Sequence, residues 1–403
     1  MNSWKDDQDR QDWLALQDRA LAVAAEGITI ADARLPDRPL IYVNEGFERL
    51  TGFTAAEALG RNCKFLQGQD ADAETVAVIR RALEEGRDCT VEILNCRKDG
   101  TRFWNRLSIT PVRDDQGTVT HFIGVQSDVT ARRRAEEALR LANDQMRNDL
   151  AEAALIQQAW LPQVLPQVPG YQFAWNFRPC TELAGDGLNI VRLDEDHVGL
   201  YILDVCGHGV PAALLSASLN RWLSPVPEQS CLFVAADDSP TGFAAAEPAA
   251  VATMLNRQFG AEPATGKFFT ILYGVLELSS RRFRYVTAGH PPPVRIHARG
   301  AEVCPLARGV PIGVLPDFEY RERSVELAPG DRLLVYTDGA LEAIDADDQE
   351  LGQQRLLDAL AELHELPPAE SLAAMIGRLE AWCPGGQPQD DITLLSVDVA
   401  GDR

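Results

Sequence analysis

Hydrophobic and polar positions divide the chain into two regions of mixed pattern, joined by one long helical pattern. In the first region, helical spacing covers residues 44–52 and 71–85. Short apolar runs bounded by Gly, Asp or Asn are typical of strands. They occupy residues 27–30, 40–43, 88–97, 102–112 and 118–128. These elements predict a compact α+β module. A helical pattern over residues 9–25 precedes it and fits either a cap on the module or a dimer contact.

The segment of residues 131–160 contains neither Gly nor Pro, and its apolar positions recur every three or four residues. They are Ala135, Leu139, Ala142, Met146, Leu150, Ala153, Ile156 and Trp160. One step departs from a strict heptad, and Asp149 falls on a nominal core position. A long helix needs a partner for its apolar face. The pattern therefore predicts a marginal coiled coil between two copies of the chain, with a solvated linker helix as the alternative.

Leu161-Pro162 ends that helix, and the second region is punctuated by four acidic motifs. They are Ala184–Asn189, Leu203–Gly209, Val335–Glu342 and Gln389–Thr393. We expect each aspartate at the end of an apolar strand or in the turn that follows. A single Asp-Gly pair is commonly only a turn. Four carboxylate motifs together instead predict a site that needs cations, and oxygen ligands suit Mg²⁺ or Mn²⁺.

Length and charge limit the remaining possibilities. A chain of 403 residues predicts two or three domains. We place an N-terminal helical cap at 1–24, the first domain at 25–130, a helical linker at 131–160 and the second domain at 161–403. The net charge of −22 argues against nucleic acid or an anionic membrane as a partner. The eight cysteines form no CxxC pair, no apolar run reaches membrane-spanning length, and the N-terminus lacks a signal-peptide pattern. A cytoplasmic location is expected.

The stretch Gly60–Gln67 places Cys63 between Arg61 and Lys64. A lone cysteine is most often core filler. The two cations, however, suggest an electropositive site that suits a reactive sulfur or a bound phosphate.

This stretch resembles the active-site signature of the light-oxygen-voltage (LOV) flavin photosensors, a branch of the PAS fold, over about residues 25–130. The resemblance implies bound FMN, with Cys63 as the photoreactive thiol that forms the photoadduct. It assigns contacts with the flavin ring and ribityl chain to Asn62, Gln67, Asn95, Asn105 and Gln126. It assigns the phosphate side to Arg61, Lys64 and Arg80. The family usually has Arg at the position of Lys64, so we expect weaker phosphate binding there.

The four acidic motifs, together with Thr287–Pro293, resemble the SpoIIE-type branch of the PPM metal-dependent serine/threonine phosphatases over about residues 155–400. The resemblance implies a sandwich of two β-sheets flanked by helices and a centre of two Mn²⁺ or Mg²⁺ ions. Asp204 would bridge the metals and the Val205 carbonyl would add a ligand. The remaining assigned ligands are Asp186, Asp338 and Asp390, with Asp391 as an extra candidate. His208 and His290 are left without a role.

The first motif departs from the family pattern. Gly187 and Leu188 stand where two aromatic residues are usual, and Asn189 replaces a second acid. Because an amide is a neutral ligand at best, this departure predicts low metal affinity. Residues 223–250 suggest an irregular surface insertion before a helix at 249–259.

Together these features predict a multidomain α+β protein that acts as a blue-light-regulated serine/threonine phosphatase. Its expected substrate is a phosphorylated protein, for which the resemblance suggests an anti-sigma-factor antagonist. Two alternatives remain: a light-gated binding module with an inactive phosphatase domain, and a flavin redox sensor that uses Cys63 only structurally. If the protein is a light-regulated phosphatase, we expect the signal to pass from Gln126 into the long helix.

Overall fold

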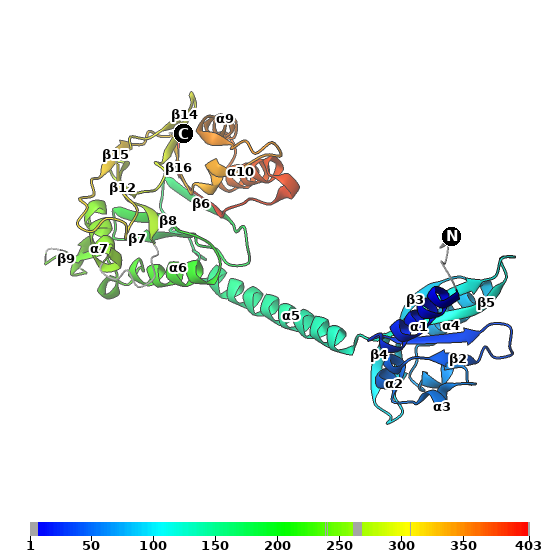
Figure 1. Ribbon diagram of the computed structural model, residues 1–403. Coiled ribbons are helices and arrows are strands. Elements are labelled where there is room, and N and C mark those ends of the chain that lie inside the picture. The colour runs from blue at the N-terminus through cyan, green and yellow to red at the C-terminus, as the bar shows by residue number, and fades with distance from the viewer. Residues whose placement is uncertain (1–6, 238, 240, 261–267, 307, 402–403) are drawn as a thin grey trace. The chain divides into compact units, whose positions relative to one another are not determined.

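A computed structural model describes residues 7–237, 239, 241–260, 268–306 and 308–401 (Figure 1). The chain forms two compact units, Met1–Gln145 and Met146–Arg403. The long helix α5 (Thr130–Ala159) contributes residues to both units.

The first unit is built on one antiparallel sheet of five strands in the order β2-β1-β5-β4-β3. The strands are β1 (Gly27–Asp32), β2 (Leu40–Val43), β3 (Cys89–Cys96), β4 (Arg102–Arg113) and β5 (Val119–Asp128). The helices are α1 (Asp7–Val23), α2 (Glu45–Thr51), α3 (Ala55–Ala58), the 3₁₀ helix η1 (Cys63–Leu66) and α4 (Ala73–Glu85). The α+β module predicted from the apolar pattern is thus present.

Local sequence explains where these helices begin and end. Asn44 accepts a hydrogen bond from the Phe47 amide at the start of α2, and Gly52 ends that helix in the left-handed conformation. Asp72 and Gly86 do the same for α4. These side-chain caps satisfy amides that have no partner inside the helix, and glycine adopts positive φ without a steric penalty.

The second unit is a sandwich of two antiparallel five-stranded sheets, with orders β15-β12-β11-β8-β7 and β14-β13-β16-β17-β6. The first sheet contains β7 (Gly187–Arg192), β8 (His197–Val205), β11 (Phe269–Glu277), β12 (Arg282–Ala288) and β15 (Arg323–Glu326). The second contains β6 (Tyr171–Arg178), β13 (Val294–His297), β14 (Gly300–Val303), β16 (Arg332–Tyr336) and β17 (Ile392–Val399).

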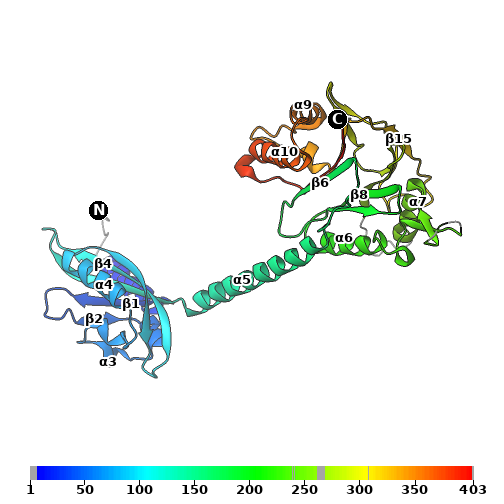
Figure 2. The same cartoon turned by 180° about the vertical axis from the view of Figure 1, so that it is seen from behind.

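Helices cover the outer faces of this sandwich (Figures 1 and 2). On the first sheet, α6 (Val210–Trp222) and α7 (Pro248–Gly260) share a buried cluster with residues such as Leu203 and Ile271. On the second, α9 (Gly352–Glu362) and α10 (Pro368–Trp382) pack with β16 and β17. A third cluster, which includes Leu200 and Val335, fills the space between the sheets. The predicted sandwich flanked by helices is confirmed.

The segment between α6 and α7 is more ordered than the sequence suggests. It contains the 3₁₀ helix η2 (Pro227–Gln229) and a hairpin of β9 (Phe233–Ala235) and β10 (Phe243–Ala245). Cys231 and Leu232 are buried in the core cluster beneath α6 and α7. The expectation of an irregular surface insertion is therefore wrong, because its few apolar residues reach the core.

Helix α5 is continuous, as its lack of Gly and Pro predicts. Within the single chain its apolar side chains are mostly exposed, including Leu139, Met146, Leu155 and Ile156. Among the described residues, we find no helix that combines the length and apolar composition of a membrane span.

Candidate functional site

A cavity of about 290 Å³ lies between the sheet of the first unit and helices η1 and α4. A smaller hollow of about 80 Å³ adjoins it and shares Arg38, Asn62 and Cys63 as wall residues. Leu83, Ile93, Leu107 and Ile109 supply apolar walls. Polar groups converge at one end. The two hollows therefore suit a flat ligand with one apolar and one polar edge.

Three buried amides form the polar end. Asn105 donates from Nδ2 to Asn95 Oδ1 at 2.9 Å and to Gln126 Oε1 at 3.1 Å. The Asn105 Oδ1 atom is buried and has no hydrogen-bond partner. Because a buried oxygen without a partner is costly, this atom indicates that a ligand donor completes the network.

Cys63 joins the same network through its sulfur. The Gln126 Nε2 atom donates to Cys63 Sγ at 3.7 Å. Burial raises the pKa of the Cys63 thiol to about 11, and the Gln126 hydrogen bond lowers it only in part. Neither Arg61 nor Lys64 contributes to this shift, because both side chains are directed to other partners. The thiol keeps its proton at neutral pH.

Of the three cations predicted to face the phosphate, two line the cavity and one does not. Lys64 and Arg80 line the cavity, but Lys64 Nζ pairs with Asp37 Oδ1 at 2.7 Å. Arg61 does not line the cavity: its guanidinium lies 4.1 Å from the centre of the Phe65 ring and donates to the Glu57 carbonyl. A cation that sequence reasoning missed, Arg38, lines both hollows. It follows Asp37 in a turn where both residues have positive φ.

The donor set of this cavity fits FMN. Amides from Asn95, Asn105 and Gln126 match the hydrogen-bonding edge of a flavin ring, and leucine and isoleucine walls match its apolar edge. Asn62 and Gln67 also line the cavity, as predicted, and Arg38 and Arg80 offer positive charge for a phosphate. The assigned roles of these residues remain predictions.

The acidic motifs of the second unit meet at one edge of the sandwich. Asp204 lies near the end of β8 and Asp338 follows β16, as expected. Asp186 and Asp390 instead precede their strands β7 and β17, so the expectation of a strand-end position is wrong for both. Antiparallel pairing explains the outcome: Gly187 at the start of β7 pairs with Leu203 near the end of β8, and Leu394 in β17 pairs with Tyr336 at the end of β16.

Asp186 is held from the second sheet. Its Oδ2 atom accepts hydrogen bonds from the hydroxyls of Thr337, at 3.0 Å, and Thr393. Both bonds use the same oxygen, which leaves Oδ1 for a ligand. Asp391 uses its two oxygens differently, accepting from the Cys180 amide at 2.9 Å and the Gly185 amide at 2.8 Å. It thus supports the chain before Asp186, and its assignment as an extra metal ligand stays a prediction.

Carboxylate crowding is visible in the pKa values. Burial raises the pKa of Asp204 to about 7, and the charges of Asp338, Asp390, Asp391 and Glu342 add to the shift. Burial likewise raises the pKa of Asp186, with Asp204 and Asp391 as the next causes. Burial is also the first cause of the raised pKa of Asp338 and of Asp390. Mutual repulsion of this kind is relieved by bound cations.

Close backbone contacts hold the motifs together. A Cβ atom at Gly339 would lie 2.2 Å from the Asp391 carbonyl oxygen, and one at Gly185 would lie 2.8 Å from the Val205 carbonyl oxygen. Only glycine permits these approaches. The oxygen donors of Asp186, Asp204, Asp338 and Asp390, with the Val205 carbonyl, fit hard divalent cations such as Mn²⁺ or Mg²⁺.

The two histidines differ in environment. His290 is buried, with Nδ1 at 2.7 Å from Thr270 Oγ1 and Nε2 at 3.0 Å from the Tyr336 carbonyl. The carbonyl can only accept, so Nε2 carries the proton and Nδ1 accepts from the hydroxyl. Burial lowers the pKa of His290 to about 3. His290 is therefore a neutral structural link, whereas His208 is exposed.

Asn189 lies away from the carboxylates. In β7, Leu188 and Ile190 belong to the core between the sheets, whereas Val191 and the paired residue Tyr201 belong to the core beneath the helices. Asn189 shares the face of Val191 because side chains alternate along a strand. The structure thus contradicts the idea that Asn189 replaces a metal ligand, and the reason given for low metal affinity no longer holds.

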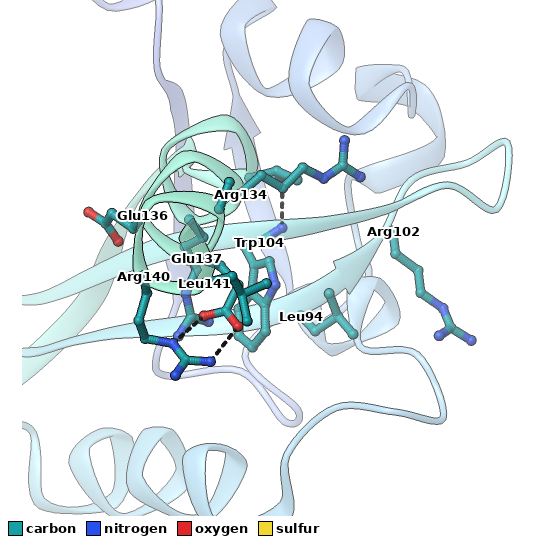
Figure 3. Close-up of a pocket in the computed structure, with 11 residues that line it drawn as sticks. Leu94, Arg102, Trp104, Arg134, Glu136, Glu137, Arg140 and Leu141 are labelled. Atoms are coloured by element: carbon teal, nitrogen blue, oxygen red, sulfur yellow. Dashed lines mark hydrogen bonds and ion pairs between the residues drawn. The ribbon is translucent and has the colours of Figure 1, made fainter. Parts of the chain in front are cut away.

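The start of α5 is attached to the sheet of the first unit beside a groove of about 710 Å³ (Figure 3). Thr130 Oγ1 accepts from the Trp104 amide at 2.8 Å, and the Arg133 guanidinium lies 3.8 Å from the centre of the Trp104 ring. Glu137 and Arg140, which also line the groove, form an ion pair on α5. Gln126 on β5 lies only four residues before Thr130, so the amide network and the helix are neighbours along one strand.

These two sites define a protein with a LOV-type PAS sensor followed by a phosphatase domain of the PP2C type. The PAS domain profile matches residues 26–131, and the Stage II sporulation protein E (SpoIIE) profile matches residues 194–400. The second match covers just over half of the chain, which therefore belongs to the SpoIIE family.

Curated relatives match the sensor. The chain is 50% identical over 111 residues to phototropin-2 of Oryza sativa subsp. japonica, covering 28% of this chain and 12% of the relative. It is 48% identical over 112 residues to a blue-light photoreceptor of Listeria monocytogenes, covering 28% of this chain and 44% of the relative. Each match thus spans less than half of the relative's length.

A solved structure matches the second unit. The SiaA-PP2C domain of Pseudomonas aeruginosa has a TM-score of 0.53 and 23% sequence identity, covering 65% of this chain and 99% of that domain. This likeness supports the PP2C-type fold.

Proposed function

We propose that this protein is a blue-light-regulated protein phosphatase that hydrolyses phosphoserine or phosphothreonine on a partner protein. The observation that carries the proposal is the presence of two candidate sites in one chain. One is an amide-lined cavity with a protonated thiol, and the other is a group of four carboxylates at a sandwich edge. The resemblance to SpoIIE-type phosphatases suggests an anti-sigma-factor antagonist as the partner.

In the sensor, bound FMN would supply blue-light absorption and an electrophilic ring for the Cys63 sulfur. Cys63 holds its proton on Sγ, and Gln126 offers Nε2 toward that sulfur and Oε1 toward Asn105. A rotation of the Gln126 amide exchanges donor and acceptor, because its two ends differ in this respect. That exchange reverses hydrogen bonds on β5, the strand that leads into α5.

In the phosphatase domain, two bound Mn²⁺ or Mg²⁺ ions would supply Lewis acidity for phosphate-ester hydrolysis. Asp186, Asp204, Asp338, Asp390 and the Val205 carbonyl would supply the oxygen donors that hold these ions. Thr337 and Thr393 orient Asp186 by donating to its Oδ2 atom. His290 remains neutral and holds Thr270 and Tyr336.

The placement of Asn189 favours an active enzyme over the alternative of an inactive binding module. The inactive alternative depends on the changed motif of Gly187, Leu188 and Asn189. Leu188 packs between the sheets and Asn189 lies on the face of Tyr201, so neither removes a carboxylate from the site.

The test is phosphate release from a phosphoserine peptide by the full chain with Mn²⁺, in the dark and under blue light. We expect metal-dependent release at rates that differ between the two conditions. Cys63→Ala should bind FMN, lose reversible bleaching of the blue absorption band and show one rate in both conditions. Release that is absent in both conditions would favour the binding module, and normal bleaching by Cys63→Ala would favour the redox sensor.

A further inference from the structure

Among the described residues of helix α5, Gln157 is the one whose side chain is buried, with 8% of its surface exposed. Both ends of its amide are used. Nε2 donates to the Ala184 carbonyl at 2.7 Å, and Oε1 accepts from the Ala184 amide at 3.1 Å. The neighbouring side chains of Ile156 and Gln158 are exposed. The second half of the helix therefore directs a polar side chain at one peptide position of the phosphatase domain.

That position is two residues before Asp186. Ala184 is fully buried, and the next residue, Gly185, donates its amide to Asp391 Oδ2 at 2.8 Å. Gly185 also lies against the Val205 carbonyl so closely that a Cβ atom would stand 2.8 Å from the oxygen. The segment has no free space on this side. A displacement at Ala184 must therefore move Gly185, and with it Asp186 or the Val205 carbonyl.

We propose that Gln157 is a positioning residue that connects the linker helix to the metal centre by holding the Ala184 backbone. Resting on the proposed function, this inference identifies the contact through which α5 sets the position of Asp186 and Val205. A shift or rotation of α5 that breaks the two hydrogen bonds releases the Ala184–Asp186 segment. Metal binding and turnover then follow the state of the helix.

The experiment compares Gln157→Leu with the matched control Gln158→Leu in the full chain. Leucine has a similar size but can make neither hydrogen bond, and Gln158 is the same residue type on the exposed side. Mn²⁺ titrations should show about tenfold weaker binding for Gln157→Leu, the factor expected for loss of one or two hydrogen bonds. The kcat should fall with KM for the peptide unchanged, and the dark and light rates should become equal. Gln158→Leu should match the wild type.

A second readout is amide hydrogen exchange across residues 183–187, which requires no activity. The Ala184 amide should exchange faster in Gln157→Leu than in Gln158→Leu or the wild type, while flavin bleaching stays normal. Gln157→Glu keeps the acceptor but loses the donor, so the Ala184 amide should exchange at a rate between those of Gln157→Leu and the wild type. This variant also serves if Gln157→Leu does not fold.

The outcomes separate the inference from the proposed function. If wild-type protein binds Mn²⁺ but releases no phosphate, the proposed function fails, and Mn²⁺ affinity and exchange still decide the role of Gln157. If Gln157→Leu shows wild-type Mn²⁺ affinity, exchange and response to light, the inference is overturned. A lower melting temperature with unchanged Mn²⁺ affinity and exchange at residues 183–187 would also overturn it, because Gln157 would then be structural only.

Discussion

At the scale of single residues, the sensor cavity shows how neighbours in sequence can serve different purposes. Arg61 and Lys64 flank Cys63, yet one stacks on Phe65 and the other pairs with Asp37. Lys64 follows Cys63 within the 3₁₀ helix η1, whereas Arg61 lies before that helix, so sequence proximity does not direct either side chain at the sulfur. The sulfur is therefore surrounded by an amide and apolar groups, and it remains a thiol.

This environment predicts that the light reaction is insensitive to pH near neutrality. Burial raises the pKa of Cys63 from 9.0 to about 11, so the protonated form persists below the lower value and is lost only as pH rises through the upper one. The bleaching rate of the flavin-loaded protein should stay constant from about pH 6 to about pH 9. Flavin absorbance recorded during blue-light illumination at each pH measures this rate. A rate that climbs steadily over this range would indicate a thiolate reaction instead.

Arg38 should recognise the phosphate of FMN. It lines the cavity, and no ion pair joins it to another described residue, whereas Lys64 is already paired with Asp37. Arg38→Gln should weaken FMN binding about tenfold, the scale of a charge-assisted contact, and leave riboflavin binding unchanged. Flavin fluorescence quenching gives both affinities.

The matched control for this prediction is Lys64→Gln, which should lower FMN affinity less than Arg38→Gln. Equal loss of FMN and riboflavin in Arg38→Gln would mean that Arg38 supports the cavity wall and does not contact the phosphate.

At the scale of elements, α5 combines a stripe of apolar residues, here called the seam, with one specific contact, that of Gln157 with Ala184. Its apolar residues, such as Leu139, Met146 and Ile156, are exposed in the single chain and suit a second copy of the helix. A switched hydrogen bond at Gln126 is worth only about 1 kcal/mol. An input of this size can shift the helix only if two arrangements are nearly balanced. The broken heptad and the small alanines of the seam favour such a balance.

Insertions near Met146 test this view of the helix. One added residue turns all later positions by about 100°, whereas seven residues return the seam to within about 20° of its phase. The one-residue insertion should abolish the difference between dark and light phosphatase rates, and the seven-residue insertion should retain most of it. Circular dichroism and light scattering check that both remain helical and equally associated. Identical responses in both proteins would show that α5 is a passive tether.

At the scale of the whole molecule, two sheets bring together carboxylates that lie far apart in sequence. Asp204 lies in a strand of the first sheet and Asp186 directly precedes one, while Asp338 and Asp390 flank strands of the second. Burial raises the pKa of all four, and the charges of neighbouring carboxylates add to the shift for Asp186, Asp204 and Asp390. A bound cation would offset this cost. Metal binding at these carboxylates would therefore be energetically linked to folding of the sandwich.

Asp204→Asn should separate stability from activity. Removing one buried charge should leave the metal-free protein at least as stable as the wild type, while phosphate release should fall to near background. Mn²⁺ at a hundred times its Kd should stabilise the wild type by about 2.7 kcal/mol, and the variant far less. Thermal unfolding with Mn²⁺ or with EDTA measures this, and flavin bleaching is the internal control. Full Mn²⁺ stabilisation of the variant would place Asp204 outside the metal centre.

Much of this protein follows from the sequence alone. Apolar spacing and turn residues located the strands and helices, because side-chain periodicity is a local property. The amides of Asn95, Asn105 and Gln126 could be predicted to face one cavity, because the resemblance to the LOV signature assigns all three to the flavin. The acidic motifs likewise indicated a metal centre before any arrangement of strands was known.

Other features were decided only by the tertiary structure. Arg38 enters the cavity through a turn, Asn189 faces away from the carboxylates, and Gln157 reaches Ala184 across 27 positions of sequence. Asp186 and Asp390 belong to one site because antiparallel pairing places the start of one strand beside the end of its neighbour. Such contacts depend on which strands are adjacent and which faces meet, and local periodicity carries no information about either.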